Sequence, residues 1–584
     1  MAEQSSLKIT LAQLNPVVGD LAGNAKKAAE AHAQAKIAGA DLVVFPELFL
    51  NGYPSEDLVL KPAFQDATLA ALERLAADCN DGPAILIGTI WREDGKVYNA
   101  VALLDGGKIE TVRLKVDLPN YGVFDEKRVF SQGPMPGPVN VRGVRIGVPI
   151  CEDIWGDEIV ETLVETGAEM IISPNGSPFD WPKPDRRMNV AVARVLESGL
   201  PLIYLNQVGG QDELVFDGGS FILNADRSLA AQMPAWQEAL ITTVWTRTAD
   251  GWRCAPSAVS PVADGNAAAY AACVLGLKDY VNKNGFPGVV LGLSGGIDSA
   301  LVAAMAVDAL GPGRVHAVML PSKYTSDESL LDAQACAKAL GVRYDKVSIE
   351  PAVAGITWNL KDMFAGTEPG VTEENLQSRL RGTILMAISN KFGGMVVTTG
   401  NKSEMSVGYA TLYGDMNGGF NPIKDLYKME VYALSQWRNG HVPAGSLGPK
   451  GIVIPERILT KAPTAELRAN QTDQDSLPPY QALDDILSCL VEHEMSLPDV
   501  IARGHAAETV KKIERLLYLA EYKRRQAAPG VKISAKNFGR DRRYPITNKF
   551  REDVPAASAT AAAGGTARAA KRVIKPAASG SDGA

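Results

Sequence analysis

Residues 289–305 constrain the fold of this chain more than any other segment. The apolar run V289-V-L-G-L293 predicts a buried strand, the turn S294-G-G296 ends it, and I297-D-S-A-L-V-A-A-M305 begins a helix. Adjacent glycines let backbone N–H groups approach an anion closely, and the following helix adds its positive N-terminal end. The segment therefore predicts a strand–turn–helix unit with an anion-binding loop.

The side chains of this loop indicate which anion it binds. Ser294 and Ser299 offer hydroxyl donors, whereas the carboxylate of Asp298 repels a phosphate unless Mg²⁺ lies between them. The loop lacks the lysine of G-x-x-x-x-G-K-[ST], so it is not of the Walker type. It resembles the pyrophosphate loop of enzymes that split ATP into AMP and pyrophosphate to activate a carbonyl or carboxylate. That resemblance implies an ATP-binding loop formed by Gly292, Leu293, Ser294, Gly295, Gly296, Ile297, Asp298 and Ser299.

Length and composition limit the partners of the chain. Its 584 residues are enough for at least two sizeable cores. The longest apolar-and-glycine run, near residues 267–277, is far shorter than the ~20 residues needed to cross a bilayer, and no secretory signal is visible. A net charge of −8 gives no general attraction to nucleic acid. Six scattered cysteines without C-x-x-C fit a reducing compartment. We therefore expect a cytoplasmic protein without membrane or nucleic-acid partners.

The strand and helix patterns divide the chain into two α/β parts. Many short strand-like runs, with helical patterns between them, fill residues 7–246. From residue 267, strands at 289–293, 315–320 and 395–399 alternate with longer helices, which predicts a doubly wound parallel sheet. We expect one domain over residues 1–250, a linker at 251–266, a second domain over 267–555 and a low-complexity, disordered tail at 556–584.

Several motifs follow the loop in the second part. Thr399 and Glu404 come just after an apolar run, so they can share a crevice with Asp298 at the carboxyl edge of the sheet. Two such carboxylates can hold one Mg²⁺ between ATP phosphates. Taken alone, however, Glu404 equally fits a helix N-terminal acid, and the basic pair Arg379 and Arg381 fits a solvated helix surface.

The whole series of motifs resembles the NAD⁺ synthetases. The motifs occur in order over residues 270–550: S294-G-G-I-D-S299, N375-L-Q-S-R-L-R381, T398-T-G-N-K-S-E404, Y413-G-D415, N421-P-I-K-D-L-Y-K428, P463-T-A-E-L467 and Q471-T-D-Q-D-S-L-P-P-Y480. The resemblance implies adenylation of the nicotinate carboxylate of deamido-NAD⁺ by ATP, followed by attack of ammonia. It also implies that Thr399, Lys428 and Thr464 contact ATP, that Asp298 and Glu404 serve Mg²⁺, and that the deamido-NAD⁺ contacts are Asn375, Arg379, Glu404, Asp415 and Lys536.

The first part carries three reactive side chains of different types at strand ends. Glu47, Lys115 and Cys151 each follow a strand-like run, which suggests a base, an oxyanion stabiliser and a nucleophile. A Cys–His pair is unsuitable because His32 is the only histidine in the first 300 residues and its surroundings predict a superficial helix. A carboxylate base with a lysine is the better interpretation. Taken singly, Cys151 is more often a small buried hydrophobe.

As a set, these residues resemble the Glu–Lys–Cys triad of the nitrilase superfamily over residues 7–245. The resemblance implies a four-layer α-β-β-α sandwich, with Glu47 as general base, Cys151 as nucleophile and Lys115 beside the oxyanion. Glu126 matches the additional glutamate of the family. The residues that correspond to L-glutamine-binding positions are Tyr121, Ser177 and Lys183.

Both resemblances together imply a glutamine-dependent ligase that forms a C–N bond and assembles as a homo-oligomer. Two alternatives remain at this point. One is another amide-forming ligase with the same loop, such as a relative of GMP or asparagine synthetase. The other is a nitrilase-type hydrolase whose second part is only a nucleotide-binding regulatory module.

Overall fold

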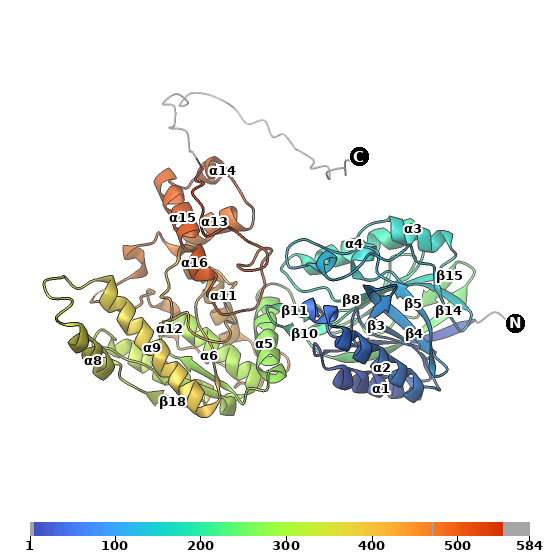
Figure 1. The fold of residues 1–584 in the computed structure, drawn as a ribbon, viewed down its shortest axis with the longest axis horizontal. Helices are drawn as coiled ribbons and strands as arrows, with labels where there is room; N and C mark the ends of the chain where they lie inside the picture. Colours follow the sequence, from blue (N-terminus) through green and yellow to red (C-terminus); the bar gives the residue numbers. More distant parts are fainter. Residues whose placement is uncertain (1–4, 470, 553–584) are drawn as a thin grey trace, which may run out of the picture.

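The computed structural model describes residues 5–469 and 471–552, and it shows two α/β parts side by side (Figure 1). The expected disordered tail at 556–584 lies outside these described residues. No helix in the two described ranges is long and apolar enough to cross a membrane.

Two mixed sheets make up the N-terminal part. The first has the strand order β15-β14-β1-β2-β3-β4-β5 and the second the order β13-β12-β9-β8-β7-β6. The first sheet contains β1 (Ser6–Gln13), β2 (Leu42–Val44), β3 (Ala84–Glu93), β4 (Lys96–Asp105), β5 (Lys108–Leu114), β14 (Ala239–Thr248) and β15 (Gly251–Cys254). The second contains β6 (Val139–Val141), β7 (Val144–Gly147), β8 (Met170–Asn175), β9 (Leu202–Asn206), β12 (Phe221–Leu223) and β13 (Leu229–Gln232).

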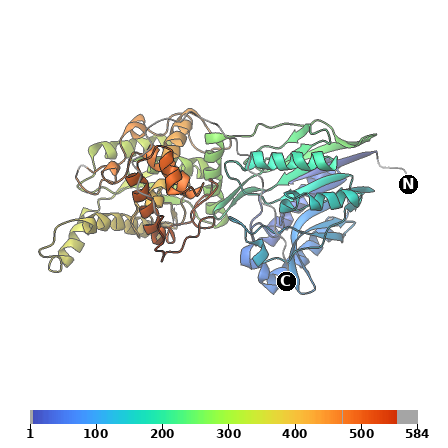
Figure 2. The same cartoon turned by 90° about the horizontal axis from the view of Figure 1, so that it is seen from above.

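The two sheets pack face to face, and helices cover their outer faces (Figures 1 and 2). Leu86 of the first sheet and Ile172 of the second share the central core. Neighbouring residues on each strand point the other way, so Ile85 packs instead against α1 (Leu21–Ile37) and α2 (Pro62–Asp78). Ile171 packs likewise against α3 (Glu158–Glu165) and α4 (Lys183–Ser198). This α-β-β-α order confirms the expected four-layer sandwich.

The prediction of a linker over residues 251–266 is wrong at its start. Residues 251–254 form β15, which pairs antiparallel with β14 at the edge of the first sheet. Trp252 and Cys254 point into the core between the sheets, so burial of these two side chains keeps the segment in the domain. The Pro- and Ser-containing composition that suggested a linker applies only to the residues after Cys254.

The C-terminal part is built on a parallel sheet of order β18-β17-β16-β19. Its strands are β16 (Val289–Gly292), β17 (Val315–Met319), β18 (Arg343–Lys346) and β19 (Met395–Val396). The sheet is flanked by α5 (Gly265–Lys283), α6 (Ile297–Leu310) and α11 (Lys428–Gly440) on one side and by α9 (Val371–Phe392) on the other. The remaining helices are α7 (Asp327–Leu340), α8 (Glu350–Leu360), α10 (Lys402–Val407), α12 (Glu456–Thr460), α13 (Tyr480–Val491), α14 (Leu497–Ala502), α15 (Ala507–Leu519) and α16 (Glu521–Arg524).

The strand expected at 395–399 is shorter than predicted. Only Met395 and Val396 pair with β16, because the chain then bends toward the segment at 420, where the N–H of Thr398 donates to the carbonyl of Phe420 at 2.9 Å. Thr399 therefore lies on a loop at the end of the sheet. Such loops beyond the carboxyl ends of parallel strands form the ligand crevice of doubly wound folds.

Helix α5 joins the two parts, lying against the hairpin of β10 (Val208–Gln211) and β11 (Leu214–Asp217) (Figure 1). One carboxylate oxygen of Asp279 accepts from the N–H of Gly210 at 2.6 Å and from Asn15 Nδ2 at 2.7 Å. Lys283 Nζ donates to the carbonyl of Gly210 at 2.8 Å. A Cβ on Gly210 would stand only 3.0 Å from the Cα of Gly276, so glycine permits this close contact between the parts.

Candidate active sites

The first site lies where three strands of the N-terminal part end. Glu47, Lys115 and Cys151 follow β2, β5 and β7, respectively, and each is at most 4 % exposed. Polar side chains become this buried only when their hydrogen-bonding groups find partners. The network around Lys115 supplies those partners.

Lys115 bridges two buried carboxylates. Its Nζ donates to Glu47 Oε1 at 2.7 Å and to Glu126 Oε2 at 2.9 Å. Asn99 Nδ2 donates to Glu47 Oε1 at 2.7 Å, and the N–H of Gly176 donates to Glu47 Oε2 at 2.8 Å. Both oxygens of Glu47 are therefore fixed by partners from separate strands and loops, so the carboxylate has a single orientation, as a general base requires.

Cys151 opens a short 3-10 turn, Cys151–Ile154, in a left-handed backbone conformation with φ of 49°. Non-glycine residues rarely adopt this region, and it costs about 1–3 kcal/mol. The carboxylate of Asp153 stabilises the turn, since it accepts from the N–H of Ile150 at 2.9 Å and from that of Asp117 at 2.7 Å. The same carboxylate thus holds the cysteine turn against the segment that carries Lys115. A sharp bend of this kind presents a nucleophile to a substrate.

Burial and charge set the protonation states of this site. Burial by itself lowers the pKa of Lys115, but the charges of Glu126 and Glu47 outweigh it, so this pKa stands well above its usual range. Burial raises the pKa of Glu126 to about 7, against the opposing charge of Lys115. Burial, reinforced by the charge of Glu47, holds the pKa of the Cys151 thiol well above its usual range. The thiol therefore keeps its proton at neutral pH, and a thiol in this state needs a base beside it to act as a nucleophile.

The residues expected to bind glutamine lie around this turn. The hydroxyl of Tyr121 donates to Glu152 Oε1, next to Cys151 in sequence, at 2.9 Å. Lys183 places its ammonium 4.6 Å from the ring centroid of Trp155, and burial lowers its pKa. Ser177 Oγ accepts from Arg187 Nε at 3.1 Å. Their ligand contacts stay predictions.

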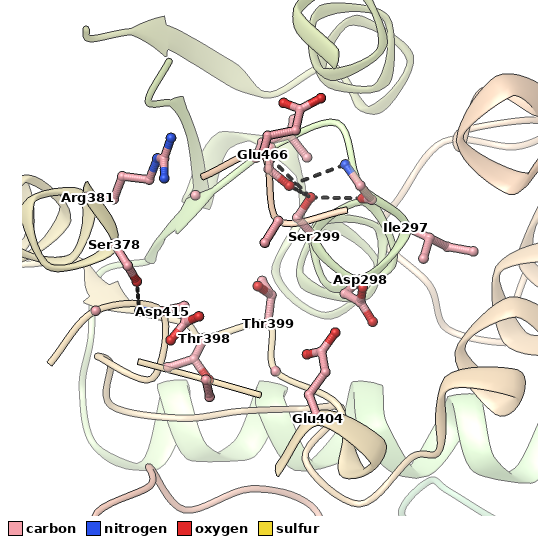
Figure 3. A pocket seen from close by; sticks show the side chains of 18 of the residues that line it. Ile297, Asp298, Ser299, Ser378, Arg381, Thr398, Thr399, Glu404, Asp415 and Glu466 are labelled. Atoms are coloured by element: carbon pink, nitrogen blue, oxygen red, sulfur yellow. Dashed lines mark hydrogen bonds between the residues drawn. The ribbon is translucent and has the colours of Figure 1, made fainter. Parts of the chain in front are cut away.

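The second site is a cavity of about 300 Å³ at the edge of the C-terminal sheet. The loop from Gly292 to Ser299 forms one wall, and Thr399, Glu404, Asp415, Lys428 and Thr464 also line the cavity. Figure 3 shows Asp298 and Glu404 on one side and Arg381 and Asp415 on the other, with Thr399 between them. The hydroxyl of Ser299 lies 3.1 Å from that of Ser294 and 2.9 Å from the carbonyl of Gly296, so it closes the loop on itself.

A lysine lies between the two carboxylates expected to serve Mg²⁺. Lys428 Nζ donates to Asp298 Oδ2 at 2.5 Å and to Glu404 Oε1 at 3.4 Å. The other oxygen of Asp298 accepts from Asn401 Nδ2 at 2.9 Å. Burial raises the pKa of Glu404 to about 8, although Lys428 opposes the shift. The two carboxylates are thus already paired with the ammonium of Lys428. Two carboxylates fit Mg²⁺, which is usually held by one or two of them together with substrate phosphates.

The other residues expected at deamido-NAD⁺ gather around a turn at residues 411–415. Asn375 Oδ1 accepts from Thr411 Oγ1 at 3.0 Å, and Arg379 Nε donates to the carbonyl of Leu412 at 3.2 Å. Asp415 lines the cavity, whereas Asn375 and Arg379 are not among its lining residues. Lys536 is apart from this group, because its Nζ pairs with Glu494 at 2.7 Å.

Several residues of both sites have no signal in the local sequence. Asn99 and Asp153 reach the first site from segments whose patterns indicate only a strand and a turn. Arg381, which the sequence assigns to a solvated helix surface, lines the second cavity, and Asn401 holds Asp298. Lys461 lines the cavity from the loop after α12. The one available signal for Lys461 is its position two residues before the P463-T-A-E-L467 motif.

Comparisons with known proteins match both parts. A family model described as carbon-nitrogen hydrolase matches residues 8–253, and one described as NAD synthase matches residues 269–527. A glutamine-dependent NAD(+) synthetase of Rhodobacter capsulatus is 53% identical over 545 residues, which cover 93% of this chain and 99% of the relative. That of Thermotoga maritima is 44% identical over 579 residues, with 94% and 99% covered.

Solved structures give the same result. The glutamine-dependent NAD+ synthetase from Acinetobacter baumannii, in complex with ADP, is 41% identical with a TM-score of 0.74, and the match covers 93% of this chain and 99% of that one. A glutamine-dependent NAD(+) synthetase from Cytophaga hutchinsonii, at 23% identity and a TM-score of 0.78 over 93% of this chain and 98% of that one, supports the fold.

A four-layer sandwich that matches the carbon-nitrogen hydrolase model, followed by a parallel sheet that matches the NAD synthase model, defines a carbon–nitrogen hydrolase fused to a synthase. Relatives share this order over nearly their whole length. The chain belongs to the family of glutamine-dependent NAD⁺ synthetases. This membership confirms the resemblance seen in the sequence. It supports neither of the two alternatives, a relative of GMP or asparagine synthetase or a hydrolase whose second part is only regulatory.

Proposed function

We propose that the N-terminal part, which ends with β15 at Cys254, hydrolyses L-glutamine to supply ammonia, and that residues 267–555 use ATP to convert deamido-NAD⁺ into NAD⁺. The observation that carries this division is the presence in one chain of two separate sites of different chemistry. One holds a thiol beside a buried Glu–Lys–Glu network, and the other an anion-binding loop with two carboxylates.

In the first site, Glu47 takes the proton of the Cys151 thiol as sulfur attacks the carboxamide carbon of glutamine. The ammonium of Lys115 stabilises the oxyanion that forms. Glu47 then gives the proton to the departing nitrogen, so ammonia and a thioester result, and water activated by Glu47 releases glutamate. Glu126 keeps Lys115 charged and in place, consistent with their 2.9 Å contact. We assign contacts with the glutamine backbone groups to Tyr121, Ser177 and Lys183.

In the second site, an oxygen of the nicotinate carboxylate attacks the α-phosphorus of ATP and pyrophosphate leaves. Ammonia then attacks the acyl carbon of the adenylate, and AMP departs. The loop from Gly292 to Ser299 orients the phosphates through its N–H groups and hydroxyls. Asp298 and Glu404 would hold Mg²⁺, which neutralises phosphate charge when bound. Thr399, Lys428 and Thr464 are the proposed further ATP contacts.

The acceptor is proposed to lie along the wall formed by α9 and the turn at 411–415. We assign Asp415 and Glu404 to the reacting end of deamido-NAD⁺, and Asn375 and Arg379 to its more distant groups. Lys536 would complete the site from the C-terminal segment after leaving Glu494.

We also propose that the protein works in the cytoplasm as a homo-oligomer. Its six cysteines are all free, which suits a reducing compartment. Trp358 on α8 and Met363 just after that helix are 67% and 78% exposed, and exposed apolar side chains of this size suit a contact with a second copy.

The decisive experiment compares NAD⁺ formation from deamido-NAD⁺ and Mg-ATP with glutamine or ammonium as the nitrogen source. Cys151→Ala should abolish glutamine-driven synthesis and preserve ammonium-driven synthesis, because the thiol belongs to the first site alone. Cys79→Ala, at a half-buried cysteine beside α2, is the matched control and should keep both activities. Equal loss with both nitrogen sources in Cys151→Ala would argue against two separable sites. Amidation of a mononucleotide or aspartate acceptor instead of deamido-NAD⁺ would contradict the proposed substrate.

A further inference from the structure

Lys461 brings a second ammonium to the cavity of the second site. It lies on the loop after α12 and lines the same cavity as Gly295 and Ser299. The loop from Gly292 to Ser299 contains neither lysine nor arginine, although pyrophosphate carries several negative charges as it leaves. Lys428 is engaged by Asp298 and Glu404 on the other side of the loop. Lys461 is a cation of this cavity outside the Asp298–Glu404 pair that is proposed to hold Mg²⁺.

A compact polar cluster holds Lys461. Its Nζ donates to Ser329 Oγ at 2.5 Å and to Glu466 Oε1 at 3.4 Å. The hydroxyls of Ser326 and Ser329 both donate to the same oxygen of Glu466 at 2.8 Å. Ser326 also caps the N-terminus of α7. The Lys461 side chain is 26% exposed, so it is anchored and remains accessible from the cavity.

This cluster directly touches the anion-binding loop. A Cβ on Gly295 would lie 2.4 Å from the carbonyl oxygen of Ser329, so the two backbones are in contact. Figure 3 places Glu466 beside the part of the loop that carries Ser299. Ser329 thus contacts the loop through its backbone and Lys461 through its hydroxyl. The ammonium of Lys461 stands on a flexible stem, which suits a shift from the serine to a phosphate on the loop.

We propose that Lys461 is a catalytic residue that binds the pyrophosphate leaving group of ATP, and that Glu466 is its positioning residue. The inference rests on the proposed ATP chemistry of this site. As the nicotinate oxygen bonds to the α-phosphorus, the bond from that phosphorus to the bridging oxygen breaks and its electron pair leaves with pyrophosphate. The Lys461 ammonium neutralises this growing charge without transferring a proton. Glu466 holds Lys461 at the cavity but competes with phosphate for it.

The test measures binding of inorganic pyrophosphate with Mg²⁺ to the full-length protein by calorimetry, together with AMP formation in both nitrogen-source assays. A charge-assisted contact contributes enough that Lys461→Met should weaken pyrophosphate binding roughly 10- to 100-fold. AMP formation should fall equally with glutamine and ammonium. Lys461→Arg should retain much of the pyrophosphate binding and AMP formation that Lys461→Met loses. Lys338→Met is the matched control, since this exposed lysine lies on α7 outside the cavity.

Glu466→Gln separates the proposal from a merely structural role. Glutamine keeps an oxygen for the two serine hydroxyls but loses the charge that competes for Lys461, so pyrophosphate should bind roughly two- to fivefold tighter. A structural defect would weaken binding instead. Pyrophosphate binding by Lys461→Met within twofold of the unaltered protein, at an unchanged unfolding temperature, would overturn the inference. If the unaltered protein neither binds pyrophosphate nor forms AMP, the proposed ATP chemistry itself fails, and this inference fails with it.

Discussion

Replacing Lys115 by methionine tests the electrostatics of the first site most directly. The ammonium lies 2.7 Å from Glu47 and 2.9 Å from Glu126, and the Lys115 and Glu47 side chains have no exposed surface. Methionine fills a similar volume but leaves two buried carboxylates without this cation. Removing one partner of a buried ion pair costs about 3–5 kcal/mol. At about 2–4 °C per kcal/mol for a domain of this size, the unfolding temperature of the N-terminal part should fall by roughly 6–20 °C.

The loss of stability in Lys115→Met should depend on pH in a defined direction. Burial raises the pKa of Glu126 from 4.5 to about 7 in the folded protein, and removing Lys115 raises it further because the opposing positive charge disappears. A carboxyl whose folded pKa exceeds its unfolded value binds more protons when folded, so stability falls as pH rises between the two values. The stability of the variant should therefore be closest to that of the unaltered protein near pH 5 and furthest below it above pH 8.

Thermal unfolding of both proteins from pH 5 to pH 9, followed by circular dichroism, measures this difference. Lys115→Met should also lose glutamine hydrolysis while ammonium-driven NAD⁺ formation persists at low temperature, since the second site is separate. A stability difference independent of pH would refute the account of the carboxylates. Retained glutamine hydrolysis would refute the assigned role of the lysine.

Three further predictions concern other parts of the chain. Asp298→Ala should eliminate NAD⁺ formation from either nitrogen source while leaving glutamine hydrolysis measurable; persistent ammonium-driven activity would contradict its assigned metal role. Arg438→Met should destabilise the C-terminal part by about 3–5 kcal/mol in denaturant unfolding, because it leaves the buried carboxylate of Asp308, now bound at 2.5 and 2.9 Å, without its cation; a change below 1 kcal/mol would speak against this pair. Tyr121→Phe should raise the KM for glutamine several-fold and leave stability within about 0.5 kcal/mol, since Tyr121 is 52% exposed; an unchanged KM would remove it from the glutamine site.

The predictions that succeeded from sequence rest on local chemistry. The alternation of short strands with helices gave the two α/β parts, because periodicity reports which faces are buried. The strand, double glycine and helix at 289–305 formed as expected, since each step is governed by neighbouring residues. Glu47, Lys115 and Cys151 could be selected because each reactive side chain ends a recognisable strand.

The predictions that failed depended on partners distant in sequence. Residues 251–254 have the composition of a connector, yet they pair with β14 because Trp252 and Cys254 complete the core between the sheets. The strand beginning at Met395 stops early because residues near 420 take its next hydrogen bonds. Neither pairing has a counterpart in the local pattern, since both depend on where the rest of the chain lies.

The sequence by itself determined the family, the four-layer and parallel-sheet folds, and the reactive residue types. Only the tertiary structure decided how those residues are charged and held. Lys115 is 11 residues from Glu126 in sequence and 68 from Glu47, and Lys461 lies 132 from Ser329, yet hydrogen bonds join all three pairs. Folding creates these contacts, and those of Lys115 lie in surroundings poor in water, where charges interact far more strongly than in the unfolded chain. The sequence therefore determines the residue types, whereas the folded structure determines their pKa values and orientations.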